Sequence, residues 1–222
     1  MDIVEKKGWI EKFEQFSIGN VADAMDKLGM KRRIISGLSP LYLGEKKTAG
    51  FARTIEQKKR VSEWNGTNLA KHGNIIDTQV QFGDIVVIAT HGYTNCSTGG
   101  GILALRAKMS GARGEITDGC LRDADEFAKI EFPVYASGTN GLKSALDLET
   151  VGSNIPVTIK GITIYPDDLL LLDATGIVCV PISKLDVVYH TALAIKNREA
   201  KMVALIESGQ SLLEARKIEL LS

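Results

Sequence analysis

Residues 84–136 read DIVVIATHGYTNCSTGGGILALRAKMSGARGEITDGCLRDADEFAKIEFPVYA, and they carry the clearest fold signal in the chain. The run from Ile85 to Ala89 is rich in β-branched residues and too short for a helix, so it predicts a buried strand. A glycine-rich turn at residues 98–101 then leads into good helix formers over residues 102–109. This order of strand, turn and helix is typical of a parallel sheet with crossover helices.

A second unit of the same kind follows directly. Residues 114–117 predict a strand and Asp118-Gly119 a turn. Residues 124–129 predict a helix, and residues 132–136 a further strand. The resulting β-α-β-α-β order favours parallel strands flanked by helices, so we predict an α/β fold class.

On the N-terminal side, the sequence indicates two helices and a strand. Ser17 is expected to cap a helix of about three turns that stops at Gly29. Residues 50–56 alternate apolar and polar side chains, as a half-buried strand does, and residues 70–76 are expected to end a second helix.

On the C-terminal side, we expect hairpins and then helices. The hairpin strands are predicted at residues 156–160, 162–165, 168–173 and 176–181. Ser183 and Asp186 have the S-x-x-D spacing of a capping box, which predicts the start of a helix that reaches about residue 207. Residues 211–220 predict a last helix.

Composition excludes several classes of protein. A length of 222 residues with 44% hydrophobic residues favours one folded domain over residues 1–222. Lys+Arg and Asp+Glu both number 27, which leaves no net field to attract nucleic acid or an anionic membrane. No apolar run approaches membrane-spanning length, and the N-terminus lacks a secretory signal, so we expect a cytoplasmic protein. We interpret the three cysteines as reduced, buried thiols, because they lack the paired spacing of a disulfide or zinc framework: Cys96, Cys120 and Cys179.

Two segments follow strands of the predicted parallel part, which is where open α/β sheets bind ligands. The first is the glycine loop, which we define as residues 99–103. Its glycines let the backbone approach a ligand closely, and the free N–H groups of the following helix suit a carboxylate or phosphate. The loop is neither G-x-G-x-x-G nor a P-loop, so plain turn chemistry remains an alternative.

The second segment is residues 117–123. Here Asp123, with Glu126 three residues on, could be an N-cap with its capping-box partner. Arg122 suggests a different interpretation, because a guanidinium next to a carboxylate could hold a divalent cation and the charge of an enolate together. The spacing alone leaves both interpretations open.

Other titratable residues give weaker signals. His72, His91 and His190 lack ligand spacing such as H-x-x-x-H, so a histidine-bound zinc or iron site has little support. His91 and Tyr93 could line the pocket of the glycine loop or lie in a surface loop. By its pattern alone, Glu199 is an ordinary solvated helix charge.

Together, these motifs resemble the RraA-like family. This family includes the class II, metal-dependent 4-hydroxy-4-methyl-2-oxoglutarate aldolases, oxaloacetate decarboxylases and the regulator of ribonuclease E activity. The similarity covers nearly the whole chain and rests on residues 23–25, 28–29, 49–54, 99–104, 111–114, 117–119, 122–123, 133–134, 156–159, 161, 166–169, 173, 176–178 and 181.

The resemblance implies an α/β/α swivelling-type fold that assembles as a homotrimer or a dimer of trimers, with active sites at subunit interfaces. In aldolase members, the loop amides bind the carboxylate of a pyruvate unit, which maps onto Gly100, Gly101, Ile102 and Leu103. The resemblance also implies that Arg122 contacts the keto oxygen of the substrate and that Asp123 binds Mg²⁺ or Mn²⁺. Glu199 is the best match to a glutamate that acts through ordered water from the C-terminal helix of a neighbouring subunit.

The sequence departs from the family pattern at two loop positions. Gly101 stands where many members carry an acidic residue, and Gly99 stands where an aromatic often precedes the loop. The ribonuclease-regulator members typically lack the Arg-Asp pair, which this chain keeps as Arg122 and Asp123. The retained pair favours an enzyme.

The resemblance therefore predicts a divalent-metal-dependent lyase that cleaves the C3–C4 bond of a pyruvate-derived 2-oxo acid through a metal-stabilised enolate. The reaction would be retro-aldol cleavage of a 4-hydroxy-4-methyl-2-oxoglutarate-type substrate, oxaloacetate decarboxylation, or both. One alternative is a non-catalytic regulator that binds a ribonuclease or helicase, and another is related enolate chemistry or a dehydratase. The expected partner is a small 2-oxo acid, with no nucleic acid and no membrane.

Overall fold

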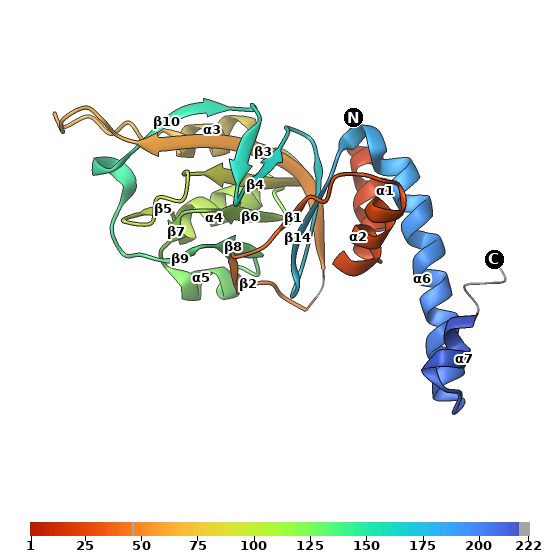
Figure 1. The fold of residues 1–222 in the computed structure, drawn as a ribbon. Helices are drawn as coiled ribbons and strands as arrows, with labels where there is room; N and C mark the ends of the chain where they lie inside the picture. Colours follow the sequence, from red (N-terminus) through yellow and green to blue (C-terminus); the bar gives the residue numbers. More distant parts are fainter. Residues whose placement is uncertain (46, 218–222) are drawn as a thin grey trace.

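The computed structural model describes residues 1–45 and 47–217 (Figure 1). Its helices are α1 (Ile3–Glu14), α2 (Ile18–Lys27), α3 (His72–Gln79), α4 (Gly101–Met109), α5 (Ala124–Lys129), α6 (Leu185–Glu207) and α7 (Leu212–Arg216), with 3₁₀ turns η1 (Ser144–Leu146) and η2 (Ile182–Lys184). Its strands are β1 (Ile34–Ile35), β2 (Ser39–Tyr42), β3 (Thr48–Lys59), β4 (Asp84–Ala89), β5 (Ser97–Gly99), β6 (Gly114–Thr117), β7 (Cys120–Leu121), β8 (Val134–Ala136), β9 (Gly138–Thr139), β10 (Leu148–Ser153), β11 (Val157–Ile159), β12 (Ile162–Ile164), β13 (Leu169–Asp173) and β14 (Gly176–Val180).

The main sheet contains the parallel unit predicted from residues 84–136. Its strand order is β1-β14-β13-β3-β4-β6-β8-β2, with β10 paired to β3. β3, β4, β6 and β8 are parallel neighbours, and α3, α4 and α5 lie in the connections between them. Parallel strands need such crossovers, so the order of local signals suffices to predict this part. The predicted α/β fold class is confirmed.

A second, small parallel sheet of β5, β7 and β9 lies beyond the carboxyl ends of the parallel strands. Each of its strands follows one strand of the main sheet along the chain: β5 follows β4, β7 follows β6, and β9 follows β8. The segments that follow β4, β6 and β8 therefore lie together in the small sheet, at one edge of the main sheet. This is the edge where open α/β sheets bind ligands.

β3 crosses the middle of the main sheet, and both of its faces are covered. Phe51 packs in a cluster with residues of α1 and α2, and Ile55 packs in another with residues of α3. Ala52, on the opposite face, joins a cluster closed by the β11-β12 hairpin. The strand predicted at residues 50–56 is confirmed, but its predicted half-burial is wrong, because neighbouring strands, helices and the hairpin enclose it.

The start of α2 follows its sequence signals. The Ser17 hydroxyl accepts a hydrogen bond from the Asn20 N–H at 3.0 Å, and the Asn20 side chain accepts one from the Ser17 N–H at 3.1 Å. Gly29 follows the helix with φ +64°, a conformation that glycine adopts without a Cβ penalty. The predicted cap and stop are both confirmed.

The start of α3 differs from the prediction. The helix begins at His72, whereas residues 70–76 were expected to contain a helix end. Lys71 occupies the N-cap position and makes no side-chain capping hydrogen bond. The boundary consequently lacks the Ser, Thr, Asp or Asn that marks a helix start in sequence.

The C-terminal region confirms the hairpins but not the predicted helix cap. β11 pairs with β12 and β13 with β14, both antiparallel. Ser183 lies inside the 3₁₀ turn that precedes α6, so it cannot cap that helix; the N-cap is Lys184, without a side-chain cap. Ser211 caps α7, and residues 218–220 of the helix expected there lie outside the described residues.

Figure 1 shows α1, α2 and α6 side by side at one end of the molecule, with the small sheet toward the other. All three cysteines are free and buried, as predicted. Among the residues that the structure describes, no helix is long and apolar enough to cross a membrane.

A buried charge cluster joins α1 to the central strands and gives a first prediction. The Asp84 carboxylate contacts Lys6 Nζ at 2.8 Å and Arg53 Nε at 3.0 Å, and all three side chains are largely buried. Replacing Asp84 with alanine leaves two buried cations without their counter-charge. We expect a loss of about 3–5 kcal/mol in the free energy of unfolding, measured by urea denaturation.

Asp77 provides the matched control for this prediction. It pairs with Arg106 on the surface, where its side chain is 59% exposed. Exposed ion pairs contribute little, so Asp77→Ala should cause only a small loss. Equal losses in the two variants would contradict the role assigned to the buried cluster.

Candidate functional site

The pairing of β5 with β7 brings the glycine loop next to Arg122. Ser97 lies opposite Cys120 and Gly99 opposite Leu121, and the Arg122 N–H donates to the Gly99 carbonyl at 3.1 Å. The chain leaves β5 directly into the loop and leaves β7 directly into Arg122. Two segments separated by about twenty residues in sequence therefore meet at the edge of the small sheet.

The loop ends at the N-terminus of α4. The first intrahelical hydrogen bond runs from the Ala104 N–H to the Gly100 carbonyl at 3.1 Å. The N–H groups of Gly101, Ile102 and Leu103 precede it and have no partner within the helix, and the Gly101 N–H donates to Asp123 Oδ2 at 3.4 Å. Together with the positive end of the helix dipole, the N–H groups of Ile102 and Leu103 form a site suited to an anion.

Gly100 leaves the space that the Arg-Asp pair occupies. A Cβ atom on Gly100 would lie 2.7 Å from Arg122 Cγ and 2.7 Å from Asp123 Oδ2. The φ of Gly100 is −177°, which is extended backbone that any residue can adopt. Glycine is therefore needed here for the close approach of two side chains, not for its backbone conformation.

Asp123 does not serve as the helix cap that the sequence also allowed. It precedes α5 in a left-handed conformation with φ +55°, and its side chain makes no capping hydrogen bond. Side-chain capping normally needs an extended N-cap residue, so the capping-box interpretation is wrong. The Asp123 Oδ2 atom instead lies 3.4 Å from the Gly101 nitrogen and 3.4 Å from Arg122 Nε, and the side chain is 43% exposed.

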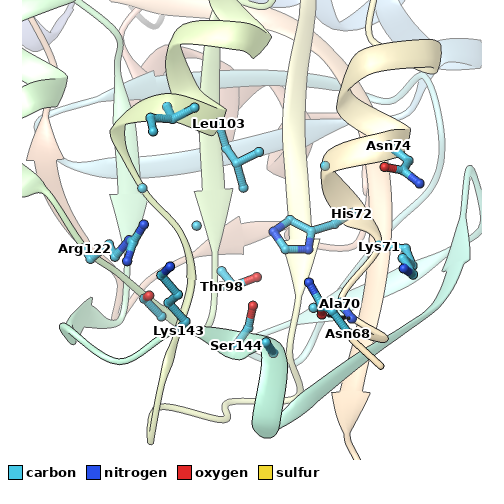
Figure 2. A pocket seen from close by; sticks show the side chains of 16 residues that line it. Asn68, Ala70, Lys71, His72, Asn74, Thr98, Leu103, Arg122, Lys143 and Ser144 are labelled. Carbon is cyan, nitrogen blue, oxygen red and sulfur yellow. Dashed lines mark hydrogen bonds between the residues drawn. The ribbon is translucent and has the colours of Figure 1, made fainter. Parts of the chain in front are cut away.

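A pocket of about 410 Å³ opens beside the loop (Figure 2). Figure 2 shows Arg122 and Lys143 on one side and His72, Lys71 and Asn74 on the other. Of the predicted substrate-binding residues, this pocket includes Gly100, Ile102, Leu103 and Arg122.

An adjoining pocket of about 310 Å³ contains Asp123 and shares Arg122. Arg122 therefore borders both spaces. Gly101 contacts the Asp123 carboxylate through its N–H but is not among the residues that line either pocket.

Two other candidate residues lie away from this site. Glu199 is on α6, where its carboxylate accepts a hydrogen bond from Asn20 Nδ2 at 2.6 Å. Within one chain it is not part of the pockets beside Arg122. His91 pairs with Glu56 at 2.9 Å, and together with Tyr93 it lines a separate pocket.

Sequence reasoning missed His72 as a pocket residue. Its side chain is buried among residues that line the pocket beside the glycine loop, and burial lowers its pKa to about 4. Its side-chain partner Gln57 comes from β3, fifteen residues earlier. A search for histidine ligand spacing could not find it, because the contact depends on the crossover between β3 and α3.

Glu115 lies buried on β6 beneath the glycine loop. One carboxylate oxygen, Oε1, would be 3.5 Å from a Cβ on Gly99 and has no hydrogen-bond partner among the described residues. Burial raises its pKa from 4.5 to about 7. Between about pH 4.5 and pH 7, the Glu115 carboxyl group is therefore protonated in the folded protein and ionised in the unfolded chain.

This proton gives a second prediction, on stability against pH. Because the unfolded chain ionises first, Glu115 lowers the free energy of unfolding as pH rises from about 4.5 to about 7, by up to ~3 kcal/mol. Urea unfolding of the parent and of Glu115→Gln at pH 5 and pH 8 should show the variant gaining stability relative to the parent at pH 8. The comparison with the parent is needed because His72, with its lowered pKa, contributes the opposite slope. If the free energies of unfolding of the parent and of Glu115→Gln differ by the same amount at pH 5 and at pH 8, the prediction is refuted. Glu11→Gln, at an exposed position, serves as the control.

The fold and this arrangement define a class of α/β proteins in which a glycine loop, a helix N-terminus and an Arg-Asp pair meet at the carboxyl edge of a parallel sheet. A family model described as RraA-like, Aldolase/RraA, matches residues 18–179. The chain belongs to this family, and the resemblance seen in its sequence is confirmed.

Relatives of this chain carry different names. It is 28% identical over 197 residues to "Protein DlpA" of Legionella pneumophila, covering 89% of this chain but only 31% of that protein. It is 28% identical over 174 residues to a "Putative 4-hydroxy-4-methyl-2-oxoglutarate aldolase" of Halalkalibacterium halodurans, covering 78% of this chain and 76% of the relative. Among solved structures, Streptomyces coelicolor RraAS2, described as "an unusual member of the RNase ES inhibitor RraA protein family", matches with a TM-score of 0.75 at 27% identity, covering 87% of this chain and 94% of that one.

Proposed function

We propose that the protein is a metal-dependent lyase that breaks the C3–C4 bond of a pyruvate-derived 2-oxo acid. One observation carries the proposal: the Arg122 guanidinium and the Asp123 carboxylate lie against Gly100, directly beside the free N–H groups of α4. A cation, a carboxylate and an anion-binding helix end are the groups that an enolate-forming reaction on an oxo acid needs. The aldolase name of the Halalkalibacterium relative supports the same chemistry.

The residues present fit a magnesium or manganese ion. Asp123 offers a hard oxygen donor, partly exposed and held next to the loop by the space at Gly100. The described residues contain no cluster of three or more His, Cys, Asp or Glu side chains that could hold a metal. The Asp123 carboxylate itself suits the ion, because Mg²⁺ commonly binds one or two carboxylates and keeps water or substrate oxygens as its other ligands. When bound, the ion supplies Lewis-acid stabilisation of negative charge on the keto oxygen.

The chain's own residues then have distinct roles. The N–H groups of Ile102 and Leu103, at the start of α4, bind the carboxylate of the pyruvyl unit, as the resemblance implies for the loop from Gly100. Arg122 faces the keto oxygen and stabilises the charge that develops there when the C3–C4 electron pair moves onto C3. In the retro-aldol reaction, the C4 hydroxyl gives its proton to solvent water and C4 leaves as a carbonyl compound, whereas in decarboxylation C4 leaves as carbon dioxide. A proton from water then adds at C3 and converts the enolate to pyruvate.

Glu199 has its proposed role only in an oligomer. It lies on α6, an element at the opposite end of the molecule from β7 (Figure 1), and its carboxylate accepts a hydrogen bond from Asn20. In a homotrimer or a dimer of trimers, Glu199 of a neighbouring copy would reach the site and act through ordered water. This role rests on the family resemblance.

A pyruvate-release assay tests the proposed reaction. Oxaloacetate and 4-hydroxy-4-methyl-2-oxoglutarate are offered with Mg²⁺ or Mn²⁺ and, in parallel, with EDTA. We expect pyruvate release from at least one substrate, and we expect EDTA to abolish it.

The second candidate function is a regulator without catalysis, which the similarity to RraAS2 favours. It predicts stable binding to a ribonuclease or helicase with no turnover under any metal condition. Absence of metal-dependent pyruvate release in a broad screen of 2-oxo acids would reject the lyase proposal in favour of this one.

A further inference from the structure

The Glu115 carboxyl group lies in an apolar part of the core, beneath the glycine loop. The residues opposite Glu115 on the neighbouring strands are Val86 of β4 and Val134 of β8. Both valines belong to a hydrophobic cluster that side chains of α3, α4 and α5 complete. Only 1% of the surface of Glu115 is exposed, so this carboxyl group occupies a position where its surroundings are apolar.

The carboxyl group reaches the inner side of the loop at the point where α4 begins. A Cβ atom on Gly99 would lie 3.5 Å from Glu115 Oε1 and 3.8 Å from Leu103 Cδ1. Leu103 is in the first turn of α4, and its N–H group is one of the two proposed to bind the substrate carboxylate. Gly99 and Leu103 line the pocket beside the loop, whereas Glu115 does not. Glu115 therefore acts on a ligand of the loop through its charge and not by contact.

The Glu115 carboxyl group lacks the partners that normally stabilise a buried carboxylate. Oε1 has no hydrogen-bond partner among the described residues. Burial raises the pKa of Glu115 from 4.5 to about 7, and no charged neighbour among these residues contributes to the shift. The positive end of the α4 dipole favours the ionised form, but that form is costly in an apolar core. The charge of the group therefore changes near neutral pH.

Other charged groups on the elements around Glu115 have partners of their own. These are Asp84 with Lys6 and Arg53, Arg106 with Asp77, Lys108 with the Ile130 carbonyl, Lys129 with Asp125 and Glu126, Arg122 with Asp123, Arg113 with Glu14, and Asp118 with Thr90. Lys71 and Lys143 line the pocket outside the loop. Burial keeps His72 neutral near pH 7 by lowering its pKa to about 4, and it raises the pKa of the Cys120 thiol.

We propose that Glu115 makes carboxylate binding by the glycine loop proton-dependent. The N–H groups of Ile102 and Leu103 bind the carboxylate of a 2-oxo acid more tightly when the Glu115 carboxyl group is protonated than when it is ionised. Two negative charges would otherwise share one helix end, so ligand binding favours transfer of a proton from water to a Glu115 oxygen. The inference rests on the proposed function, because it uses the carboxylate site on the loop, and it adds a regulation of that site.

Reciprocity between the two binding events fixes the direction of the pH effect. If a bound carboxylate raises the pKa of Glu115 by about one unit, ionisation of Glu115 weakens carboxylate binding about tenfold. Glu115 in the free protein ionises as pH rises through about 7. Carboxylate binding should therefore be tightest below pH 7 and weaken above it.

Pyruvate binding to the protein with saturating Mg²⁺, measured by isothermal titration calorimetry from pH 6 to pH 8.5, tests this directly. Pyruvate is an anion over the whole range, so its own charge does not change. We expect the Kd of the parent to rise by up to about tenfold with pH. Glu115→Gln, whose amide stays neutral, should lack this rise, whereas exposed Glu11→Gln should keep it. The same rise in Glu115→Gln as in the parent would overturn the proposal.

A second measurement needs no variant. Titration of the parent with pyruvate at pH 7.5 in Hepes and in Tris, which release protons with different enthalpies, gives the number of protons taken up on binding. A one-unit rise in the pKa of Glu115 predicts uptake of about half a proton per pyruvate bound. Binding with no proton uptake would contradict the proposal.

Carbon NMR identifies the group that takes up the proton. In protein labelled with ¹³C at the glutamate side-chain carboxyl carbons, the Glu115 signal, assigned by its loss in Glu115→Gln, should titrate near pH 7 and at higher pH once pyruvate is bound. If the parent binds pyruvate but this midpoint does not move, the regulation is refuted and the carboxylate site stands. If pyruvate binds at no pH, the carboxylate site of the proposed function fails, and this inference fails with it.

Discussion

Replacing either Arg122 or Asp123 with alanine is expected to lower the rate of pyruvate release by a factor on the order of 10²–10³ or more. Arg122 supplies the fixed positive charge for the developing enolate, and Asp123 supplies the carboxylate for the divalent ion. The two side chains are partly exposed and 3.4 Å apart, a geometry that contributes little to folding. Initial rates with saturating Mg²⁺ and urea unfolding curves measure the two effects separately.

The Arg106 and Asp77 pair is the matched control. It is also a surface ion pair of arginine and aspartate, at 2.5 Å, and its arginine lies on α4, the helix that begins in the glycine loop. Arg106→Ala and Asp77→Ala should keep parent turnover. If Arg122→Ala or Asp123→Ala also keeps parent turnover while folded, the assignment of the site is wrong.

Adding a single methyl group at Gly100 is expected to have an effect of similar size. The new Cβ in Gly100→Ala would lie 2.7 Å from both Arg122 Cγ and Asp123 Oδ2, so both side chains must move. Displacement of reacting groups by about 1 Å can cost on the order of 10² in rate. The backbone at Gly100 is extended and accepts alanine, so the fold should persist.

Mn²⁺ affinity, measured by isothermal titration calorimetry, provides a readout besides activity. We expect Gly100→Ala to weaken Mn²⁺ binding together with turnover. Gly8→Ala adds the same methyl group on α1, where nothing lies within 4 Å, and should change neither quantity. Parent activity in Gly100→Ala would show that the close approach of the loop to the Arg-Asp pair has no functional role.

Local sequence signals predict the parallel unit well, because each of its elements has its own pattern. The β-branched run before Ala89, the glycines before α4 and the cap at Ser17 all act within a few residues. The same signals predict that the glycine loop and Arg122 end up together, since both follow neighbouring parallel strands. The larger part of the candidate site could thus be predicted from strand order alone.

The errors arise where tertiary structure overrides a local pattern. Thr54 and Gln57 of β3 are buried because strands flank β3 on both sides and helices and a hairpin cover its faces. Asp123 has the spacing of a capping residue, but its left-handed backbone turns the carboxylate to the loop. His72 gives no signal at all, since its partner Gln57 and the Thr98 hydroxyl that bonds Gln57 come from two different strands.

The most direct test of the central claim follows the methyl signal of pyruvate in D₂O by proton NMR, with Mg²⁺ and with EDTA. Pyruvate is the part of the substrate that all the proposed reactions share, so the result does not depend on the leaving half. We predict that the protein with Mg²⁺ replaces the methyl protons with deuterium, and that EDTA or Asp123→Ala stops the exchange. Exchange no faster than with Mg²⁺ alone, or exchange that persists in EDTA, would contradict a metal-dependent enolate site at Arg122 and Asp123.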